Sequence, residues 1–324
     1  MIDFQRERIV VTGGAGFLGR HLQVELLARG LPPENLLVPR SEDFDLTRED
    51  DVVRMYQHFQ PTVVIHMAAK VGGIGANRAN PGLFFYANLA MGLHLIEHAR
   101  QTGLKKFVQV GTICAYPKFT PVPFREEDLW AGYPEDTNAP YAIAKKALLV
   151  MLQAYRQQYA LNGIYLLPVN LYGPGDNFHP ENSHVIPALV RKFVDARQRG
   201  NDEVVVWGSG LASREFLYVE DAARAVALAA QRYESGEPVN IGAGFEITIR
   251  DLVAKIRNLV GFEGRVVWDT SKPDGQPRRS LDTTRARQFG FQATTSFDEG
   301  LRRTIDWWCE QKLLGAEKNY DRGD

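Results

Sequence analysis

The sequence predicts an α/β fold, a Rossmann-type doubly wound parallel sheet followed by a smaller α/β C-terminal substrate domain. Short, continuously apolar segments alternate with longer segments of helical periodicity in the first half of the chain, which is typical of parallel strands buried on both faces. In addition, the apolar residues 8–12 lead directly into a glycine-rich turn and then an amphipathic helix at 20–29. This order is typical of a unit that binds a dinucleotide.

Composition narrows the possible classes of protein. The 324 residues are 44% hydrophobic and 24% charged, with a net charge of -1, which indicates an ordinary globular chain without a global field for nucleic acid or anionic membrane. The N-terminal residues are charged, and no stretch approaches the roughly 18 apolar residues of a membrane span. The two cysteines, Cys114 and Cys309, predict neither a disulfide framework nor a zinc site. We therefore expect a cytoplasmic protein with no metal, nucleic-acid or membrane partner.

The glycine turn comprises Gly13, Gly16 and Gly19, with Phe17 and Leu18 inside it. Glycines permit a tight turn and a close approach of the backbone to a pyrophosphate, which the following helix N-terminus also attracts. A second apolar strand, 35–38, ends near Arg40. A cation in that place suits the extra phosphate of NADP, whereas enzymes for NAD usually carry an acidic residue there. The sequence therefore favours NADP(H).

Two further strands, 63–69 and 107–110, are each followed by a loop. Because ligands bind at the carboxyl ends of parallel strands, we expect Ala68, Ala69 and the loop 111–118 to face the nicotinamide.

Tyr141 and Lys145 stand four residues apart at the start of a predicted helix that reaches about Tyr159, so their side chains share one face. An ammonium beside a phenol stabilises the phenolate, so we expect a lowered pKa for Tyr141 and a role as general acid or base. A Tyr-x-x-x-Lys alone is common on helix surfaces, and the other motifs must support this interpretation.

The second half of the chain predicts a second unit. We expect strands at 164–170, 203–207 and 214–219, a helix within 176–199, an alanine-rich helix after 220–221, and capping boxes at 248–251 and 296–299. The expected division is 1–171 for the NADP-binding domain, with segments near 214–240 and 280–290 returning to it, 172–315 mainly for the substrate domain, and 316–324 for a tail.

Several blocks resemble a known family. The glycine turn, Thr112 and the Tyr141/Lys145 pair resemble the extended short-chain dehydrogenase/reductases. More narrowly, the chain resembles the GDP-L-fucose synthase family over nearly its whole length, on residues 68–74, 114–118, 170–174, 176–180, 182–189, 206–210 and 214–217. The resemblance implies epimerisation of GDP-4-keto-6-deoxy-D-mannose at C3 and C5, followed by NADPH-dependent reduction at C4 to GDP-L-fucose.

The resemblance also assigns roles. Cys114 and His184 match the family's pair for epimerisation, which needs a base and an acid on opposite faces of the sugar. Tyr141 would protonate the C4 alkoxide, Lys145 would lower the pKa of Tyr141 and hold the nicotinamide ribose, and Thr112 would bond the keto oxygen in place of the family's usual serine. The implied cofactor contacts are Gly13, Gly16, Phe17, Leu18, Gly19, Arg40, Asp45, Leu46, Ala68, Ala69, Tyr141, Lys145 and His184. The implied substrate contacts are Asn170, Val185, Lys192, Trp207, Arg214, Lys272 and Arg278.

Two alternative functions remain open, whereas a third, dehydration, does not fit the residues. Dehydratases of this superfamily carry an Asp-Glu pair after the Thr, where this chain has Ile113 and Cys114, which argues against dehydration. A GDP-L-colitose synthase-like enzyme, inverting only C5 of a 3-deoxy substrate, would also use Cys114 and His184. A non-catalytic NADP-sensing protein would not need the full residue set. Relatives pair through two long helices, which implies a homodimer through residues 84–100 and 141–159.

Overall fold

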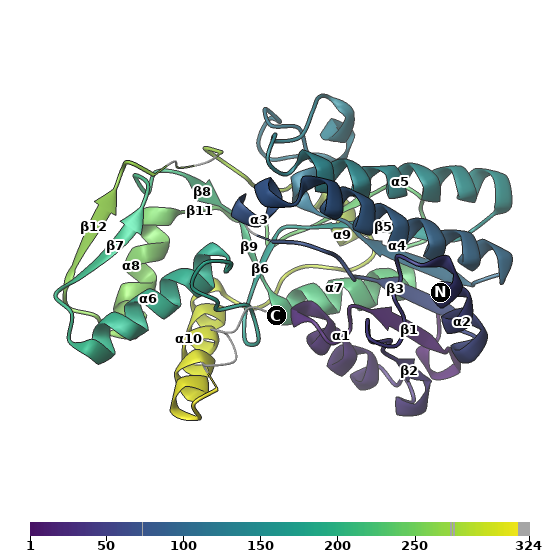
Figure 1. The fold of residues 1–324 in the computed structure, drawn as a ribbon, viewed down its shortest axis with the longest axis horizontal. Coiled ribbons are helices and arrows are strands. Elements are labelled where there is room, and N and C mark those ends of the chain that lie inside the picture. The colour runs from purple at the N-terminus through teal and green to yellow at the C-terminus, as the bar shows by residue number, and fades with distance from the viewer. Residues whose placement is uncertain (73, 273, 275, 317–324) are drawn as a thin grey trace.

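A computed structural model describes residues 1–72, 74–272, 274 and 276–316 of the chain, and its centre is a six-stranded sheet (Figure 1). The sheet order is β10-β5-β4-β3-β1-β2, and every neighbouring pair is parallel. Its strands are β1 (Ile9–Thr12), β2 (Leu36–Leu37), β3 (Val63–His66), β4 (Lys106–Val110), β5 (Gly163–Pro168) and β10 (Val239–Ile241). The predicted α/β class with a parallel sheet is confirmed.

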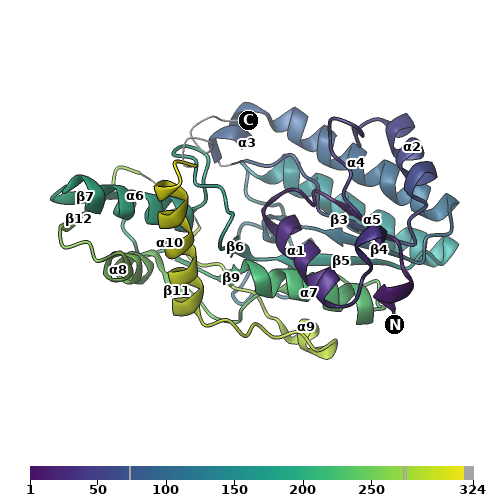
Figure 2. The ribbon, with the colours of Figure 1, turned by 90° about the horizontal axis from the view of Figure 1, so that it is seen from below.

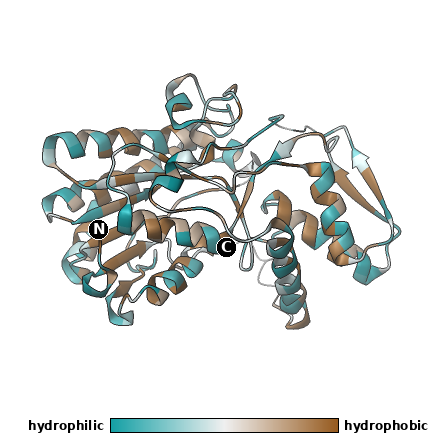
Figure 3. Cartoon of the chain, turned by 180° about the vertical axis from the view of Figure 1, so that it is seen from behind, coloured by the Kyte–Doolittle hydropathy of each residue, from teal (hydrophilic) through white to brown (hydrophobic). Residues whose placement is uncertain are grey.

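Helices cover both faces of this sheet (Figures 1 and 2). Helices α1 (Phe17–Ala28) and α7 (Val219–Arg232) pack together on one face, and α2 (Glu49–Phe59), α4 (Pro81–Gln101) and α5 (Ala139–Tyr159) pack on the other. The central strands are hydrophobic along their length (Figure 3). All residues of β1, β3 and β4 are buried, which explains why their sequences are nearly continuous apolar runs.

A second group of elements packs beside the sheet around its own hydrophobic core. It contains α6 (Val185–Arg199), α8 (Ile249–Val260), α10 (Phe297–Leu313) and the parallel pair β7 (Glu203–Trp207) and β12 (Arg265–Asp269). Thr248 and Ser296 accept hydrogen bonds from the amides of Asp251 and Glu299, at 3.0 and 3.3 Å, so both predicted helix starts are confirmed. The remaining short elements are α3 (Ile74–Ala79), α9 (Thr284–Gln288) and the 3₁₀ turns Phe4–Arg6, Pro33–Asn35, Ile113–Ala115 and Glu126–Trp130.

Two predicted strands are each divided between sheets. Strand β5 ends at Pro168, which has no N–H to donate, and the next residues form β6 (Asn170–Tyr172), which pairs with β9 (Phe216–Tyr218). Likewise β8 (Ser213–Arg214) pairs with β11 (Ile247–Thr248) rather than continuing into β9. The predictions of single strands at 164–170 and 214–219 are therefore wrong. The predicted first helix also begins earlier than expected, at Phe17 rather than residue 20.

The hydrophobic cores support a division of the chain. Residues from β1 to Val169 share one core with α7, β10 and residues 281–291, whereas α6, α8 and α10 share the other. On these contacts we propose the predicted domains, with 214–240 and 280–290 returning to the first. Most of the predicted tail, from residue 317 on, lies outside the described residues. No helix among the described residues is long and apolar enough to cross a membrane.

Glu215 separates β8 from β9 and ties three segments together. Its side chain is fully buried, and its carboxylate accepts hydrogen bonds from the amides of Ala243 at 2.6 Å, Gly244 at 2.8 Å and Leu281 at 2.6 Å. Burial raises the pKa of Glu215, although these backbone donors favour the charged form. The carboxylate therefore serves as a buried acceptor that fixes the backbone of two loops, at 243–244 and at 281, to the chain between β8 and β9.

Replacement of Glu215 by Ala is expected to lower the free energy of unfolding by about 3–5 kcal/mol, because a fully buried side chain is truncated and three amides lose their acceptor. Urea denaturation measures this change. Glu220→Ala is the matched control, because Glu220 is half exposed and its ion pair with Arg303, at 3.4 Å, is on the surface. This substitution should lower the free energy of unfolding by less than about 0.5 kcal/mol. Equal stability of the two variants would contradict the assigned role of Glu215.

Candidate active site

The glycine turn packs tightly against its surroundings. Gly13 has a φ of 71°, and a Cβ there would lie 2.7 Å from the Ala68 amide nitrogen. A Cβ at Gly19 would lie 2.3 Å from the Gly13 carbonyl oxygen. The turn thus requires glycine at both positions, and Gly16 caps α1, whose first-turn amides are available to an anion. Phe17 and Leu18 form the first turn of that helix.

The loop after β3 is fixed beside this turn. The Ala68 amide donates to the Thr12 hydroxyl at 3.4 Å, and the Asn88 side chain bonds both the amide and the carbonyl of Lys70, at 3.2 and 2.8 Å. Asn88 is fully buried in α4. Ala68 and Ala69 therefore stand next to the glycine turn, as expected of residues that contact the cofactor.

The residues expected near the adenosine ribose follow β2. The Arg40 guanidinium is exposed and lies 3.6 Å from the Glu42 carboxylate. Asp45 bonds the hydroxyl and the amide of Thr47, at 2.7 and 3.0 Å, and these bonds hold the pKa of Asp45 below its usual value. Leu46 is buried. Arg40 therefore has a charge that a phosphate can engage, and Asp45 is already satisfied within its own loop.

Replacing Arg40 by Ala is expected to raise the KM for NADPH about 10- to 100-fold, the range of a lost charge-assisted hydrogen bond. The KM for NADH should change little, because NADH lacks the 2′-phosphate. Steady-state kinetics with both cofactors provides the test. An equal rise in the KM values for NADPH and NADH would show that Arg40 does not recognise the 2′-phosphate.

The predicted catalytic residues meet where β4 ends and α5 begins. The Thr112 side chain caps the 3₁₀ turn Ile113–Ala115 by accepting the Cys114 amide at 3.2 Å, and it lies close enough to the Tyr141 phenol to lower the pKa of Tyr141. Lys145, one turn further along α5, donates to the Val110 carbonyl at 3.3 Å and lies 6.0 Å from the Tyr141 ring centroid. Cys114 is close enough to Tyr141 to raise the pKa of the phenol. Four of the five predicted catalytic residues thus lie together.

Burial dominates the electrostatics of this cluster. It raises the pKa of Tyr141, with a smaller contribution from Cys114, and it lowers the pKa of Lys145 to about 8. The predicted fall in the pKa of Tyr141 is therefore wrong in this structure, because the desolvated ammonium is bonded to Val110 and does not offset the burial of the phenol. As a result Tyr141 keeps its proton at neutral pH, which is the form that a proton donor needs.

The fifth residue, His184, is the N-cap of α6. The surrounding protein lowers the pKa of His184 by desolvation, which favours the neutral imidazole. No hydrogen bond among the described residues joins His184 to Cys114 or Tyr141. The next residue, Val185, packs on the second core.

Three of the predicted substrate residues lie together around an exposed tryptophan. Trp207, at the end of β7, is exposed and has Lys192 and Lys272 on it, with their Nζ atoms 5.4 and 5.6 Å from the ring centroid. Arg214 is partly buried, and burial, followed by repulsion from Arg279, lowers its pKa to about 10. The two lysines and the indole offer the stacking surface and the charge that a nucleotide diphosphate requires.

Two predicted substrate residues have other partners. The Arg278 guanidinium forms an ion pair with the Glu246 carboxylate, with its Nη2 2.5 Å from Oε2. Asn170 donates to the Glu215 carbonyl at 3.4 Å.

Sequence reasoning missed Arg279, whose Nη1 donates to the Cys114 Sγ at 3.9 Å. The sequence signal is the Arg278-Arg279 pair itself, which does not reveal which of the two faces the thiol.

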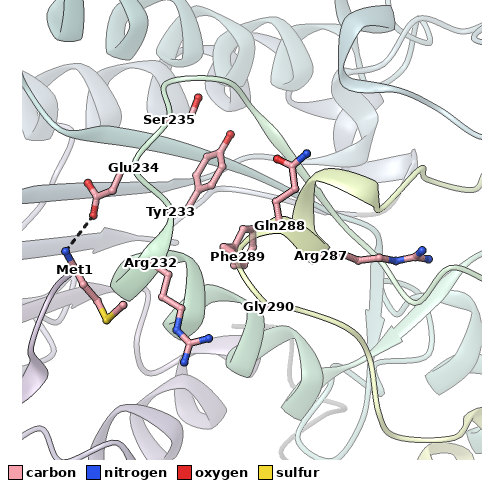
Figure 4. Close-up of a pocket in the computed structure, with 9 residues that line it drawn as sticks. All are labelled: Met1, Arg232, Tyr233, Glu234, Ser235, Arg287, Gln288, Phe289 and Gly290. Carbon is pink, nitrogen blue, oxygen red and sulfur yellow. Dashed lines mark ion pairs between the residues drawn. The ribbon is translucent and has the colours of Figure 1, made fainter.

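Two cavities, of about 570 and 660 Å³, lie elsewhere. The first lies between the end of α7 and α9, where the Met1 amino group is 3.9 Å from Glu234 (Figure 4). The second lies between residues of α2 and α4. Neither is lined by a predicted site residue, so we do not assign them to the active site. Within the described part of the chain, no cluster of His, Cys, Asp and Glu could hold a metal ion.

A parallel dinucleotide-binding sheet with a Thr, Tyr and Lys cluster at its strand ends defines an extended short-chain dehydrogenase/reductase. The chain belongs to the NAD dependent epimerase/dehydratase family, whose model matches residues 9–242.

Similarity to known proteins narrows this class. The chain is 44% identical over 303 residues to GDP-L-fucose synthase 1 of Arabidopsis thaliana, covering 94% of this chain and 93% of that protein. It is 31% identical to GDP-L-colitose synthase of Yersinia pseudotuberculosis, covering 94% and 99%. The solved structure of a GDP-L-fucose synthetase from Naegleria fowleri bound to NADP matches with a TM-score of 0.85 and 30% identity, covering 94% of each chain. The predicted resemblance to the GDP-L-fucose synthase family is confirmed.

Proposed function

We propose that the protein converts GDP-4-keto-6-deoxy-D-mannose to GDP-L-fucose as an NADPH-dependent 3,5-epimerase and 4-reductase. The observation that carries this proposal is that Cys114, Thr112 and Tyr141 lie together where β4 ends and α5 begins. The loop after β4 thereby offers a thiol for moving protons at carbon, and the start of α5 offers a phenol for delivering a proton to oxygen. The 44% identity to the Arabidopsis GDP-L-fucose synthase 1 supports the substrate.

Epimerisation uses the acidity of the carbons beside the C4 ketone. One of Cys114 and His184 takes the proton from carbon, the electron pair of the C–H bond moves to the keto oxygen, and the other returns a proton on the opposite face. Thr112 and Tyr141 are placed to donate hydrogen bonds to that oxygen as its charge develops. A thiol and a neutral imidazole can both exchange protons near neutral pH.

Reduction uses the same oxygen. NADPH, when bound, supplies the hydride to C4. Tyr141 gives its proton to the C4 oxygen as the alkoxide forms, and Lys145 supplies positive charge next to the phenolate that remains. The glycine turn and the amides of α1 would hold the pyrophosphate, and Arg40 would hold the 2′-phosphate.

The nucleotide end of the substrate would lie on the second group of elements. Trp207 would stack on the base or ribose, and Lys192, Lys272 and Arg214 would bind the diphosphate. Lys192 keeps the charge of the arginine found in some relatives without its bidentate geometry.

NADPH oxidation with GDP-4-keto-6-deoxy-D-mannose tests this function, with GDP-mannose as the control because it lacks the ketone. Loss of NADPH absorbance only with the keto-sugar supports the proposal. The same assay with a 3-deoxy keto-sugar tests the second candidate, a GDP-L-colitose synthase-like activity, which the 31% identity to the Yersinia enzyme favours. Cofactor binding without turnover of either sugar would indicate the NADP-sensing alternative.

We also propose a homodimer through α4 and α5, in the cytoplasm. Both helices expose apolar side chains, Leu83, Tyr86 and Leu93 on α4 and Val150 on α5. Light scattering should give a mass near twice 36.4 kDa for the native chain. The double variant Leu93→Glu and Val150→Glu should give a monomer, and a native monomer at the same concentration would contradict the interface.

A further inference from the structure

We infer that Arg279 is a positioning residue for Cys114, where it holds the sulfur and stabilises negative charge on it during proton transfer. This inference deepens the proposed function and rests on it. In either direction of transfer, one state of Cys114 is a thiolate: the sulfur accepts a proton from carbon as S–H forms, or it gives one up as C–H forms. A fixed cation next to the sulfur favours that state.

The first support is the set of side-chain contacts around Arg279. Its Nη1 donates to the Cys114 Sγ at 3.9 Å, and its Nε donates to the Gln276 side-chain oxygen at 2.5 Å. The Gln276 amide in turn donates to the Lys118 carbonyl. Because Lys118 and Cys114 belong to the same loop, the segment that carries Arg279 is attached to that loop at two points.

The second support is the anchoring of the backbone at Arg279. The Glu215 amide donates to the Arg279 carbonyl at 3.0 Å, and the buried Glu215 carboxylate accepts the Leu281 amide at 2.6 Å. Before Arg279, the Pro277 carbonyl accepts the Ser213 amide at 2.9 Å, so the main chain on both sides of Arg279 is fixed to β8 and to Glu215. A guanidinium on an anchored backbone loses little further freedom when it bonds the thiol.

The third support is the charge balance. Among the described residues, no carboxylate forms an ion pair with Arg279, whereas its neighbour Arg278 is paired with Glu246 at 2.5 Å. Arg279 instead faces a second cation, Arg214, and a sulfur. Its positive charge is therefore not paired with a carboxylate in the described part of the chain and is available to a thiolate.

The test measures the reactivity of the thiol in the whole protein without substrate or NADPH. The rate of alkylation by iodoacetamide is followed against pH by mass spectrometry, because only the thiolate reacts. Cys309, the other cysteine, is an internal reference. Arg279→Gln should move the pH midpoint at Cys114 upward by about one unit and slow alkylation at neutral pH about tenfold. Arg279→Lys should restore part of the rate.

Two further variants keep the test decisive. Gln276→Leu leaves the cation in place without its anchor, so it should shift the midpoint in the same direction by less. Arg287→Gln, on the same segment but away from the site, should leave the profile unchanged. If Arg279→Gln does not melt cooperatively, the test uses Arg279→Lys and Gln276→Leu instead. A wild-type pH profile of Cys114 alkylation in both variants would overturn the inference.

A diphosphate-binding role alone would also overturn it. In that case Arg279→Gln would raise the KM for the nucleotide-sugar with an unchanged alkylation profile. Because alkylation requires no sugar, a wrong substrate assignment would appear only in the turnover assays and would leave the shift at Cys114 intact.

Discussion

Replacing Tyr141 by Phe is expected to lower the rate of NADPH oxidation about 10²- to 10⁴-fold, the usual contribution of a general acid. The substitution removes only the hydroxyl, which is protonated at neutral pH because burial raises the pKa of Tyr141. Exchange of hydrogen at C3 and C5 should fall much less, since Thr112 can still bond the keto oxygen. Tyr133→Phe is the matched control, because Tyr133 is 64% exposed, and it should behave as wild type.

The pH dependence of reduction follows from Lys145 in the same cluster. Its pKa is lowered to about 8 by burial, so the ammonium is present below that pH and is lost as pH rises through it. Because kcat/KM reports groups of the free enzyme, it should fall above about pH 8. A profile that stays flat well above this pH, or a Tyr141→Phe variant within a few-fold of wild type, would contradict the roles of these two residues.

Replacing Cys114 by Ser is expected to reduce deuterium uptake at the sugar carbons by at least about 10³-fold, and product formation with it. A serine hydroxyl is a far weaker acid than a thiol, so it cannot exchange a proton at carbon near neutral pH, although it fits the same space. The cofactor site should be intact, because the Cys114 amide, not its sulfur, bonds Thr112. Binding of NADPH to the variant, measured by fluorescence, checks this point.

Cys309→Ser provides the control for this substitution. Cys309 is in α10, where burial raises its pKa, and it has no part in the proposed chemistry. Cys309→Ser should catalyse deuterium exchange at the sugar carbons and reduction of the C4 ketone at the wild-type rates. Undiminished deuterium uptake in Cys114→Ser would remove the thiol from the mechanism.

The sequence was informative where local rules decide the structure. Glycines at 13 and 19 were predictable because the turn admits no Cβ, and the helices after Thr248 and Ser296 were predictable from their caps. Tyr141 and Lys145 could be placed on one helix face from their spacing alone. In each of these cases the determining contacts lie within a few residues or within one βαβ unit.

Features set by distant contacts were not predictable. The division between β8 and β9 depends on the Glu215 carboxylate, whose partners are 28 to 66 residues away. The choice of Arg279 over Arg278 as the neighbour of Cys114 spans 165 residues. The direction of the shift in the pKa of Tyr141 required its burial, because spacing indicates only that Lys145 is near. The sequence therefore predicted which side chains lie together at the candidate site better than it predicted their environment.

The most direct test of the account is one reaction of the native protein with GDP-4-keto-6-deoxy-D-mannose and NADPH in heavy water, with mass and proton NMR analysis of the sugar. We expect deuterium at both C3 and C5 of a product reduced at C4, since one site performs both reactions. A reduced product without deuterium would show a plain ketoreductase and would contradict the roles of Cys114 and His184. Deuterium at both carbons without NADPH consumption would likewise contradict the role of Tyr141 in reduction.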